Sequence, residues 1–133
     1  MKRLLDTSTL IDILRGEPSV TARFRATRPS DLLISAISAG ELAAGAALAR
    51  EPHREIFALD MLLRPLASVA LDNRIAQRAG AIDAAQRKRG ARIGVADRLI
   101  AATALEHDAV VVTSDTSHFA RVPFLVTEDW RAA

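Results

Sequence analysis

Four acidic residues stand where the chain is expected to leave a strand or to begin a helix. Asp6 follows a short apolar run, and Asp115 follows three consecutive valines and two small polar residues. Glu41 and Asp97 lie near the starts of two predicted helices. In open parallel sheets, ligands collect outside the carboxyl ends of the strands, where helices also begin. The positions therefore predict that these four carboxylates converge.

Four carboxylates in one place would need a cation. Two like charges about 4 Å apart repel by roughly 4 kcal/mol at an effective dielectric constant of 20. A site of oxygen ligands with several anionic members suits a hard divalent ion such as Mg²⁺ or Mn²⁺. Mg²⁺ keeps several waters and typically completes its shell with substrate phosphate, so such a site is suited to phosphodiester hydrolysis. The hydroxyls of Thr7, Ser8, Thr113 and Ser114 are placed to hydrogen-bond a carboxylate, a metal-bound water or the scissile phosphate.

Each acidic residue also has a purely structural explanation. Asp6 can form a turn after a strand, and Asp115 can form an Asx turn or cap the following turn. Asp97 can be a helix cap or a favourable charge in the first turn of a helix. Ser38 and Glu41 have the spacing of a capping box, in which Glu41 reaches back to the Ser38 N–H. Only the joint placement of the four acids favours the metal site.

Three other features favour structural roles. His118 follows a turn and is interpreted as a surface histidine, so it is left out of the catalytic set. The basic run RKRGAR at residues 87–92 could bind nucleic-acid phosphates. Basic residues at a helix end followed by Gly90 are, however, ordinary dipole and capping chemistry, which is the preferred interpretation. Trp130 is expected to anchor packing.

Strands and helices are predicted to alternate along the chain. Apolar runs indicate strands, while helical spacing of apolar residues and cap or breaker residues indicate helices. The alternation favours the α/β class, with a central, mostly parallel sheet covered by helices on both faces. A helix that feeds directly into a parallel strand begins at the carboxyl edge, which places Asp97 with the other acids. The strands are expected near residues 4–5, 31–35, 66–70, 109–113 and 124–126, and the helices near residues 7–14, 19–28, 38–51, 52–63, 72–89 and 95–107.

The composition is that of a single globular domain spanning residues 1–133. Half of the residues are hydrophobic and 26% are charged, a balance that leaves little room for long disorder. The positive charge is nearly all arginine, which suits phosphate, but a net charge of +2 does not by itself identify an anionic partner. The absence of cysteine excludes disulfides, a thiol nucleophile and cysteine-ligated zinc.

The sequence also predicts a cytoplasmic protein without a membrane span. Lys2 and Arg3 resemble the start of a signal peptide, but Asp6 interrupts the apolar run after two leucines. The apolar stretch from Leu99 is broken by Glu106, well short of the roughly 20 residues of a membrane span.

Four segments, taken together, resemble the PIN-domain ribonucleases and most closely the VapC toxins of type II toxin–antitoxin pairs. The resemblance covers nearly the whole chain, because the segments occur in the family's order and spacing. They are LLDTSTLID near the start, ISAISAGELAAG around Glu41, IGVADRLIAATAL around Asp97 and VVVTSDTSHF near the end.

The resemblance implies a Mg²⁺- or Mn²⁺-dependent endoribonuclease with a PIN-like α/β/α fold. By position, Asp6, Glu41, Asp97 and Asp115 would form the metal site, and Thr113 would help to position them. A helical hairpin around residues 39–63 would contribute to a homodimer and to a groove for an antitoxin peptide. Family members can vary at the fourth acidic position, which is Asp115 in this chain. Arg98, in contrast, stands where the family commonly has an apolar residue. Whether its side chain points toward substrate or solvent therefore stays open.

Other functions stay open on the sequence alone. A catalytically silent module that binds RNA or protein is one alternative, although the four intact acids argue against it. A metal nuclease acting on DNA is another, because nothing in the sequence identifies a reader of the RNA 2′-hydroxyl. A receiver-like or phosphatase domain fits poorly, because position 8 is Ser where one phosphotransfer pattern has a second Asp.

Overall fold

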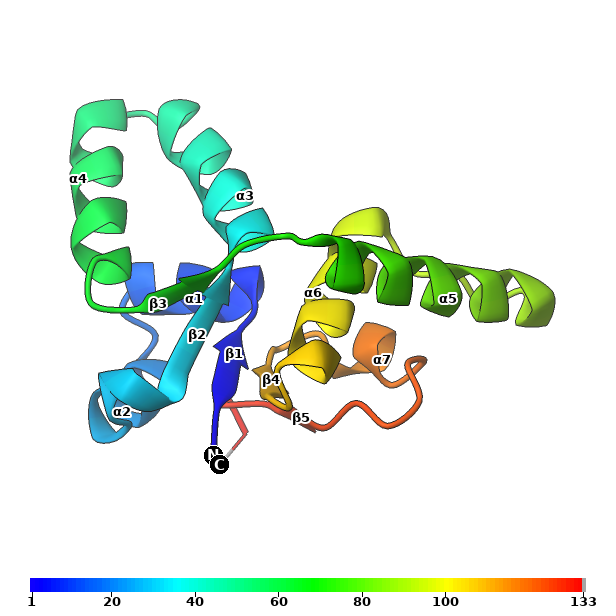
Figure 1. The fold of residues 1–133 in the computed structure, drawn as a ribbon. Helices are drawn as coiled ribbons and strands as arrows, with labels where there is room; N and C mark the ends of the chain where they lie inside the picture. The colour runs from blue at the N-terminus through cyan, green and yellow to red at the C-terminus, as the bar shows by residue number, and fades with distance from the viewer. Residues whose placement is uncertain (133) are drawn as a thin grey trace.

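Five short parallel strands form the centre of the molecule in the computed structural model, which describes residues 1–132 (Figure 1). Their order across the sheet is β3-β2-β1-β4-β5, and every neighbouring pair is parallel. The prediction of a mostly parallel sheet is therefore confirmed. The strands are β1 (Arg3–Leu5), β2 (Leu32–Ser35), β3 (Ala67–Val69), β4 (Val110–Val112) and β5 (Thr127–Glu128).

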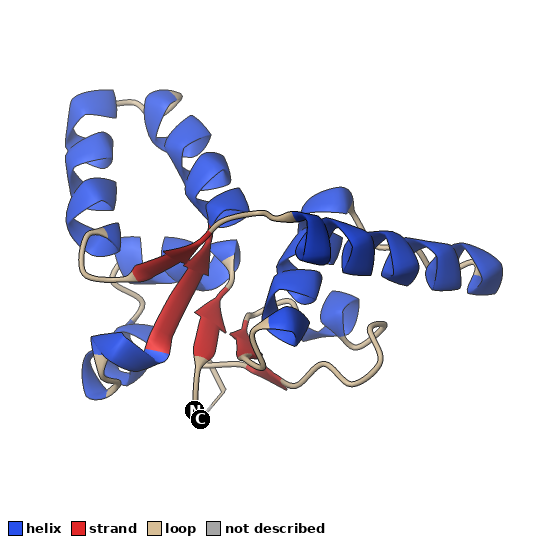
Figure 2. Cartoon of the chain, in the orientation of Figure 1, coloured by secondary structure: helices blue, strands red, loops and turns tan. Residues whose placement is uncertain are grey.

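Helices cover both faces of this sheet, which gives the predicted three-layer α/β/α arrangement (Figure 2). Successive strand residues point to opposite faces. Leu5 and Val112 therefore pack on the side of α1 to α4, whereas Leu4 and Val111 pack on the side of α5 to α7. The helices are α1 (Thr7–Leu14), α2 (Pro18–Ala26), α3 (Ala36–Ala47), α4 (Pro52–Leu63), α5 (Asn73–Arg89), α6 (Val95–Glu106) and α7 (Thr116–Phe119), with a short 3₁₀ turn η1 (Pro29–Asp31).

The winding of the chain reverses direction between β1 and β4. From β1 the chain steps outward to β2 and then to β3, with α1 to α4 on one face. It then passes through α5 and α6 on the other face and returns to β4, on the far side of β1. The carboxyl ends of β1 and β4 thus flank a topological switch point, which is the place where open α/β sheets bind ligands.

Local capping chemistry explains where several helices begin and end. The Ser35 side chain accepts a hydrogen bond from the Ile37 N–H and starts α3 directly at the end of β2. Asp72 caps α5 through the Ile75 N–H, as predicted. Gly90 ends α5 in the left-handed conformation, with φ of 67°, where a residue without a Cβ is favoured.

Two sequence predictions of elements are wrong. Helix α3 begins at Ala36, so Ser38 lies inside the helix and the capping box with Glu41 does not form. The last strand is Thr127–Glu128, three residues after the expected start at residue 124. Phe124 has a positive φ of 67° and is 96% exposed, so the apolar run that predicted a strand begins in a turn and continues without regular structure to residue 126. Trp130, as expected, is buried and anchors the core on the α1 to α4 side.

Helices α3 and α4 form the predicted hairpin, which projects from the body of the molecule beyond β3 (Figure 1). Within residues 1–132, no helix combines the length and the apolar character needed to cross a membrane.

Candidate active site

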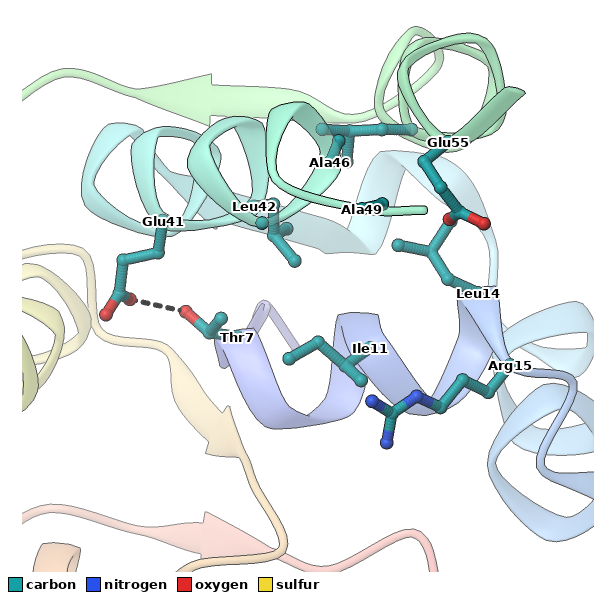
Figure 3. A pocket seen from close by; sticks show the side chains of 11 residues that line it. Thr7, Ile11, Leu14, Arg15, Glu41, Leu42, Ala46, Ala49 and Glu55 are labelled. Carbon is teal, nitrogen blue, oxygen red and sulfur yellow. Dashed lines mark hydrogen bonds between the residues drawn. The ribbon is translucent and has the colours of Figure 1, made fainter. Parts of the chain in front are cut away.

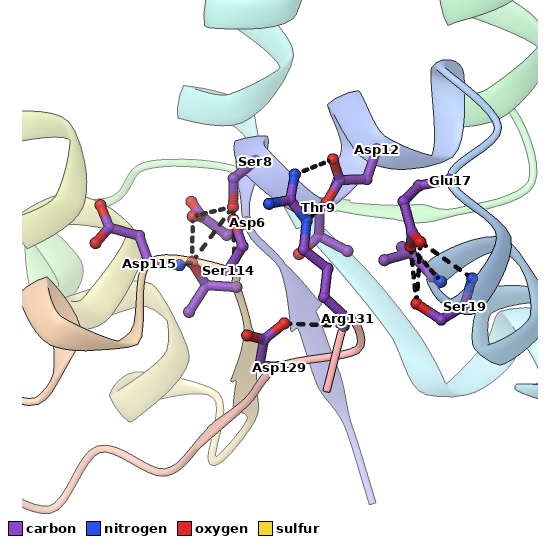
Figure 4. A network of polar contacts seen from close by, with 12 residues as sticks. Asp6, Ser8, Thr9, Asp12, Glu17, Ser19, Ser114, Asp115, Asp129 and Arg131 are labelled. Atoms are coloured by element: carbon purple, nitrogen blue, oxygen red, sulfur yellow. Dashed lines mark hydrogen bonds and ion pairs between the residues drawn. The ribbon is translucent and has the colours of Figure 1, made fainter. Parts of the chain in front are cut away.

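Asp6 lies at the carboxyl end of β1 and is 5% exposed. Its main chain forms the N-cap of α1, but its side chain makes no capping hydrogen bond. Instead, Asp6 Oδ2 accepts a hydrogen bond from the Thr113 hydroxyl at 2.8 Å. It also accepts one from the Ser8 hydroxyl at 3.1 Å (Figure 4). The carboxylate is therefore held toward the tip of β4, away from the capping position that a simple turn residue would adopt.

Thr113 connects the tips of β1 and β4. The residue is fully buried, and its hydroxyl accepts a hydrogen bond from the Asp115 N–H at 2.9 Å while it donates to Asp6. One hydroxyl thus fixes both the direction of the Asp6 carboxylate and the backbone that carries Asp115.

Glu41 lies in the second turn of α3 and reaches toward the start of α1. The Thr7 hydroxyl is 2.7 Å from Glu41 Oε1 and 2.9 Å from the Ser38 hydroxyl oxygen (Figure 3). Because α3 begins at the end of β2 and α1 begins at the end of β1, this contact joins two neighbouring strand ends. Glu41 is therefore positioned from the same edge of the sheet as Asp6.

Asp97 and Asp115 meet at the imidazole of His118. Asp97 is in the first turn of α6, and Asp115 directly precedes α7. His118 Nδ1 lies 2.8 Å from Asp115 Oδ2 and 3.3 Å from Asp97 Oδ2. One ligand atom from each of these three residues lies within 4.8 Å of the other two, a spacing that a single metal ion can span.

Charge interactions link these acids to one another. Burial raises the pKa of Asp6 above its usual value, the hydroxyls of Thr113 and Ser8 oppose this rise, and the charge of Asp97 adds to it. Burial also raises the pKa of Asp97; His118 opposes the rise, and the charges of Asp115 and Glu41 add to it. The structure thus brings the other three predicted acids, Asp6, Glu41 and Asp115, within electrostatic reach of Asp97.

The donor set fits a hard divalent ion. Seven other acids have an arginine partner within 4.0 Å: Asp12, Asp31, Glu51, Asp60, Asp83, Glu106 and Glu128. Within residues 1–132, none of the four converging acids has a Lys or Arg partner at that distance. Carboxylate oxygens without a cationic side chain are the ligands that Mg²⁺ and Mn²⁺ prefer. Asp6, Glu41, Asp97 and Asp115 could hold such an ion.

His118 is the residue of this site that sequence reasoning missed. The interpretation as a surface histidine captured its exposure, since half of the side chain is solvent-accessible, but missed its direction. A signal was available in the spacing of Asp115 and His118, because residues three apart in a helical turn lie on the same side.

Arg98 and the basic run contribute elsewhere. Arg98 is buried, and its Nη1 donates to the Ile93 carbonyl at 2.5 Å and lies 3.6 Å from Asp83 Oδ1. Arg87 and Arg92 both bind Asp83 at 3.0 Å. The capping interpretation is confirmed at the end of α5, where Gly90 is the C-cap and Arg87, Lys88 and Arg89 lie in the last turn.

A groove of about 560 Å³ runs from the site between α1, α3 and α4 (Figure 3). Thr7 and Glu41 line it at the end nearest the acids. Its lining is otherwise largely apolar and includes Ile11, Leu14, Leu42, Gly45, Ala46, Ala49 and Leu59, with Arg15 and Glu55 as further polar groups.

Comparisons with known proteins agree with this fold. Residues 3–125 match the family described as PIN domain. The chain is 31% identical to the tRNA(fMet)-specific endonuclease VapC of Salmonella typhimurium and 30% identical to ribonuclease VapC2 of Haemophilus influenzae, with 98% of each chain covered in both cases. Among solved structures, it superposes on the DNA-bound VapBC complex of Salmonella typhimurium with a TM-score of 0.92 at 31% identity, covering 98% of both chains. It superposes on FitAcB of Neisseria gonorrhoeae with a TM-score of 0.86 at 28% identity, covering 98% of this chain and 99% of that one.

Proposed function

This chain belongs to the PIN-domain family, and we propose that it acts in the cytoplasm as a metal-dependent endoribonuclease, the toxin of a toxin–antitoxin pair. The observation that carries the proposal is the convergence of Asp6, Glu41, Asp97 and Asp115 without a cationic side chain beside them in residues 1–132. Relatives named as VapC ribonucleases and VapBC complexes support the RNA substrate and the antitoxin partner.

In this proposal, the four carboxylates hold the metal and orient the reactants. A bound Mg²⁺ or Mn²⁺ would neutralise charge on the scissile phosphate and make an attacking water more acidic. Asp6, fixed by Thr113 and Ser8, would keep its Oδ1 edge available for the metal while Oδ2 accepts the two hydroxyls. Asp97 or Asp115, being more exposed, would accept the proton of the attacking water.

The partly apolar groove between α1, α3 and α4 would receive the antitoxin. Its apolar lining fits one face of an amphipathic segment, which is a common way for a peptide to bind between helices. Because Thr7 and Glu41 line one end, a segment seated there would approach the acidic residues and obstruct RNA. This arrangement accounts for neutralisation by direct occlusion of the site.

Cleavage of RNA by the purified protein tests the central proposal. The first defined substrate is tRNA(fMet), which names the Salmonella relative, followed by total RNA and a single-stranded DNA of matched length. We expect RNA cleavage with Mg²⁺ or Mn²⁺, none with EDTA, and a loss of at least about 100-fold in Asp6→Asn and Asp97→Asn.

Asp108→Asn is the matched control for these variants. Asp108 is exposed, has a positive φ that asparagine also tolerates, and lies before β4, at the end of that strand opposite the site. Cleavage should survive this change. Equal residual cleavage in wild type, Asp6→Asn and Asp97→Asn would point to a contaminating nuclease and contradict the proposal. Preferential cutting of DNA would show that the substrate is DNA and not RNA.

A further inference from the structure

His118 presents a nitrogen ligand to a site otherwise built from carboxylates. Its Nδ1 faces Asp115 Oδ2 at 2.8 Å and Asp97 Oδ2 at 3.3 Å, so the ring bridges two acids from different elements. The side chains of His118 and Asp115 are each nearly half exposed, so the ligand atoms of this group are accessible to an ion from solvent.

The backbone around His118 holds the ring in this direction. The next residue, Phe119, is fully buried in the core between the sheet and α5 to α7. The Ala120 N–H donates to the Thr116 carbonyl at 2.9 Å, and the Arg121 N–H donates to the His118 carbonyl at 3.2 Å. With Phe119 anchored inward, the short helix α7 keeps His118 on its outer side, next to the site. The imidazole is thus positioned before any ion arrives.

A nitrogen ligand changes which ion the site prefers. Mg²⁺ is bound through carboxylates, phosphates and water and demands near-ideal octahedral geometry. Imidazole suits first-row transition metals, and affinity for a nitrogen- and oxygen-containing site rises from Mn²⁺ through the later members of that row. A site with Asp97, Asp115 and His118 as ligands would therefore favour Mn²⁺ over Mg²⁺ more strongly than carboxylates alone.

We propose that His118 Nδ1 is a direct ligand of the ion held by Asp97 and Asp115, and that it makes this site favour Mn²⁺ over Mg²⁺. The inference rests on the proposed metal-dependent function and extends it to the identity of the ion. In the absence of the ion, Nδ1–H donates to the neighbouring carboxylate; with the ion, the proton resides on Nε2 and the Nδ1 lone pair faces the metal.

Pulsed electron paramagnetic resonance of the Mn²⁺-loaded protein tests this directly, because nitrogen bound to Mn²⁺ gives a ¹⁴N modulation. We expect the modulation in wild type and its loss in both His118→Gln and His118→Ala. His53→Gln and His107→Gln alter the other two histidines of the chain, one on α4 and one after α6, and should retain it.

Calorimetric titration with Mn²⁺ and with Mg²⁺ gives the second readout. We expect His118→Gln to weaken Mn²⁺ binding by about tenfold and Mg²⁺ binding by less than about twofold. Absent ¹⁴N modulation in wild type, modulation that persists in both His118 variants, or equal loss of affinity for the two ions would each overturn the inference, because His118 would then only position Asp115 and Asp97.

The outcomes for ion and function can be told apart. A ¹⁴N modulation that depends on His118, without RNA cleavage, would preserve the ligand assignment and overturn the nuclease. Cleavage that depends on Asp6 and Asp97, without the modulation, would preserve the nuclease and overturn the ligand assignment. A protein that binds no Mn²⁺ would overturn the ligand assignment whether or not it cleaves RNA.

Discussion

Hydroxyl groups hold the buried carboxylate of Asp6, although a cation would stabilise it more. The donors are Thr113 and Ser8, while Asp97 contributes a second negative charge nearby. A hydrogen bond from a neutral hydroxyl returns only part of the hydration that a carboxylate loses on burial. The site is therefore arranged for ion binding at some cost in stability when no ion is bound.

Replacing Asp6 by Asn should accordingly stabilise the metal-free protein. Burial raises the pKa of Asp6 in the folded state above its value in the unfolded chain, so the ionised side chain destabilises the fold. The loss of folding free energy grows as pH rises from the pKa of the unfolded chain to the pKa of the folded protein. We expect Asp6→Asn to raise the free energy of unfolding at pH 7 in EDTA by about 1 kcal/mol, or Tm by about 3 °C. Thermal denaturation from pH 7 downward should show the difference shrinking as the wild-type carboxyl becomes protonated.

Added Mg²⁺ or Mn²⁺ should reverse the order of stability. An ion that binds only the folded state raises the Tm of the wild type with increasing concentration, whereas Asp6→Asn loses much of this gain. Asp108→Asn should follow the wild type in both conditions. A lower Tm for Asp6→Asn than for wild type in EDTA at pH 7 would contradict this prediction, because the ionised Asp6 would then stabilise the metal-free fold.

The placement of individual elements separates what the sequence could predict from what it could not. β1, β2 and β4 are apolar runs buried between helices, so local pattern was enough to find them, and with them the strand ends that carry Asp6 and Asp115. β5 is a two-residue edge strand whose Glu128 binds Arg3 of β1. That position depends on a tertiary contact across 125 residues, which no local pattern contains.

Glu41 and His118 illustrate the same limit within the site. The local spacing of Ser38 and Glu41 predicted a cap, but Ser35, at the end of β2, takes that role and leaves Glu41 free to contact Thr7. The contact between His118 and Asp97 spans 21 residues and required the packing of α7 beside α6. Convergence of distant side chains follows from topology, whereas their exact partners follow from packing.

A glycine on helix α3 allows a test of whether the antitoxin binds in the groove. Gly45 lines the groove, and a Cβ at this position would meet no atom within 4 Å. Gly45→Leu should therefore fold well, since leucine favours helix, while its side chain enters the groove. We expect RNA cleavage to persist and binding of the cognate antitoxin to weaken at least about tenfold, or about 1.4 kcal/mol, in calorimetry.

Gly80→Leu provides the matched control for the groove. Gly80 lies in α5, away from the groove, and is equally open to an added side chain. This variant should bind the antitoxin as wild type does. Unchanged antitoxin affinity in Gly45→Leu would show that the segment docks elsewhere.

At the scale of the whole molecule, the projecting hairpin exposes several large apolar side chains. Leu48, Ile56, Phe57 and Met61 on this hairpin are each about half exposed or more. Apolar groups gathered on one protruding element are typical of an interface. The proposed homodimer would bury them by packing the hairpins of two copies together, beside the groove that each copy offers to an antitoxin.

Sedimentation velocity and light scattering should find the wild type at twice the 14.3 kDa mass of the chain. Phe57→Glu, which places a charge among these exposed apolar side chains, should yield a monomer of nearly unchanged Tm, because the Phe57 side chain is 67% exposed in the single chain. Phe124→Glu is the matched control: Phe124 is 96% exposed on the loop before β5, so its replacement should leave the dimer intact. A wild type that stays monomeric at micromolar concentration would contradict the homodimer itself. A dimer that is disrupted by Phe124→Glu and not by Phe57→Glu would place the interface away from the hairpin.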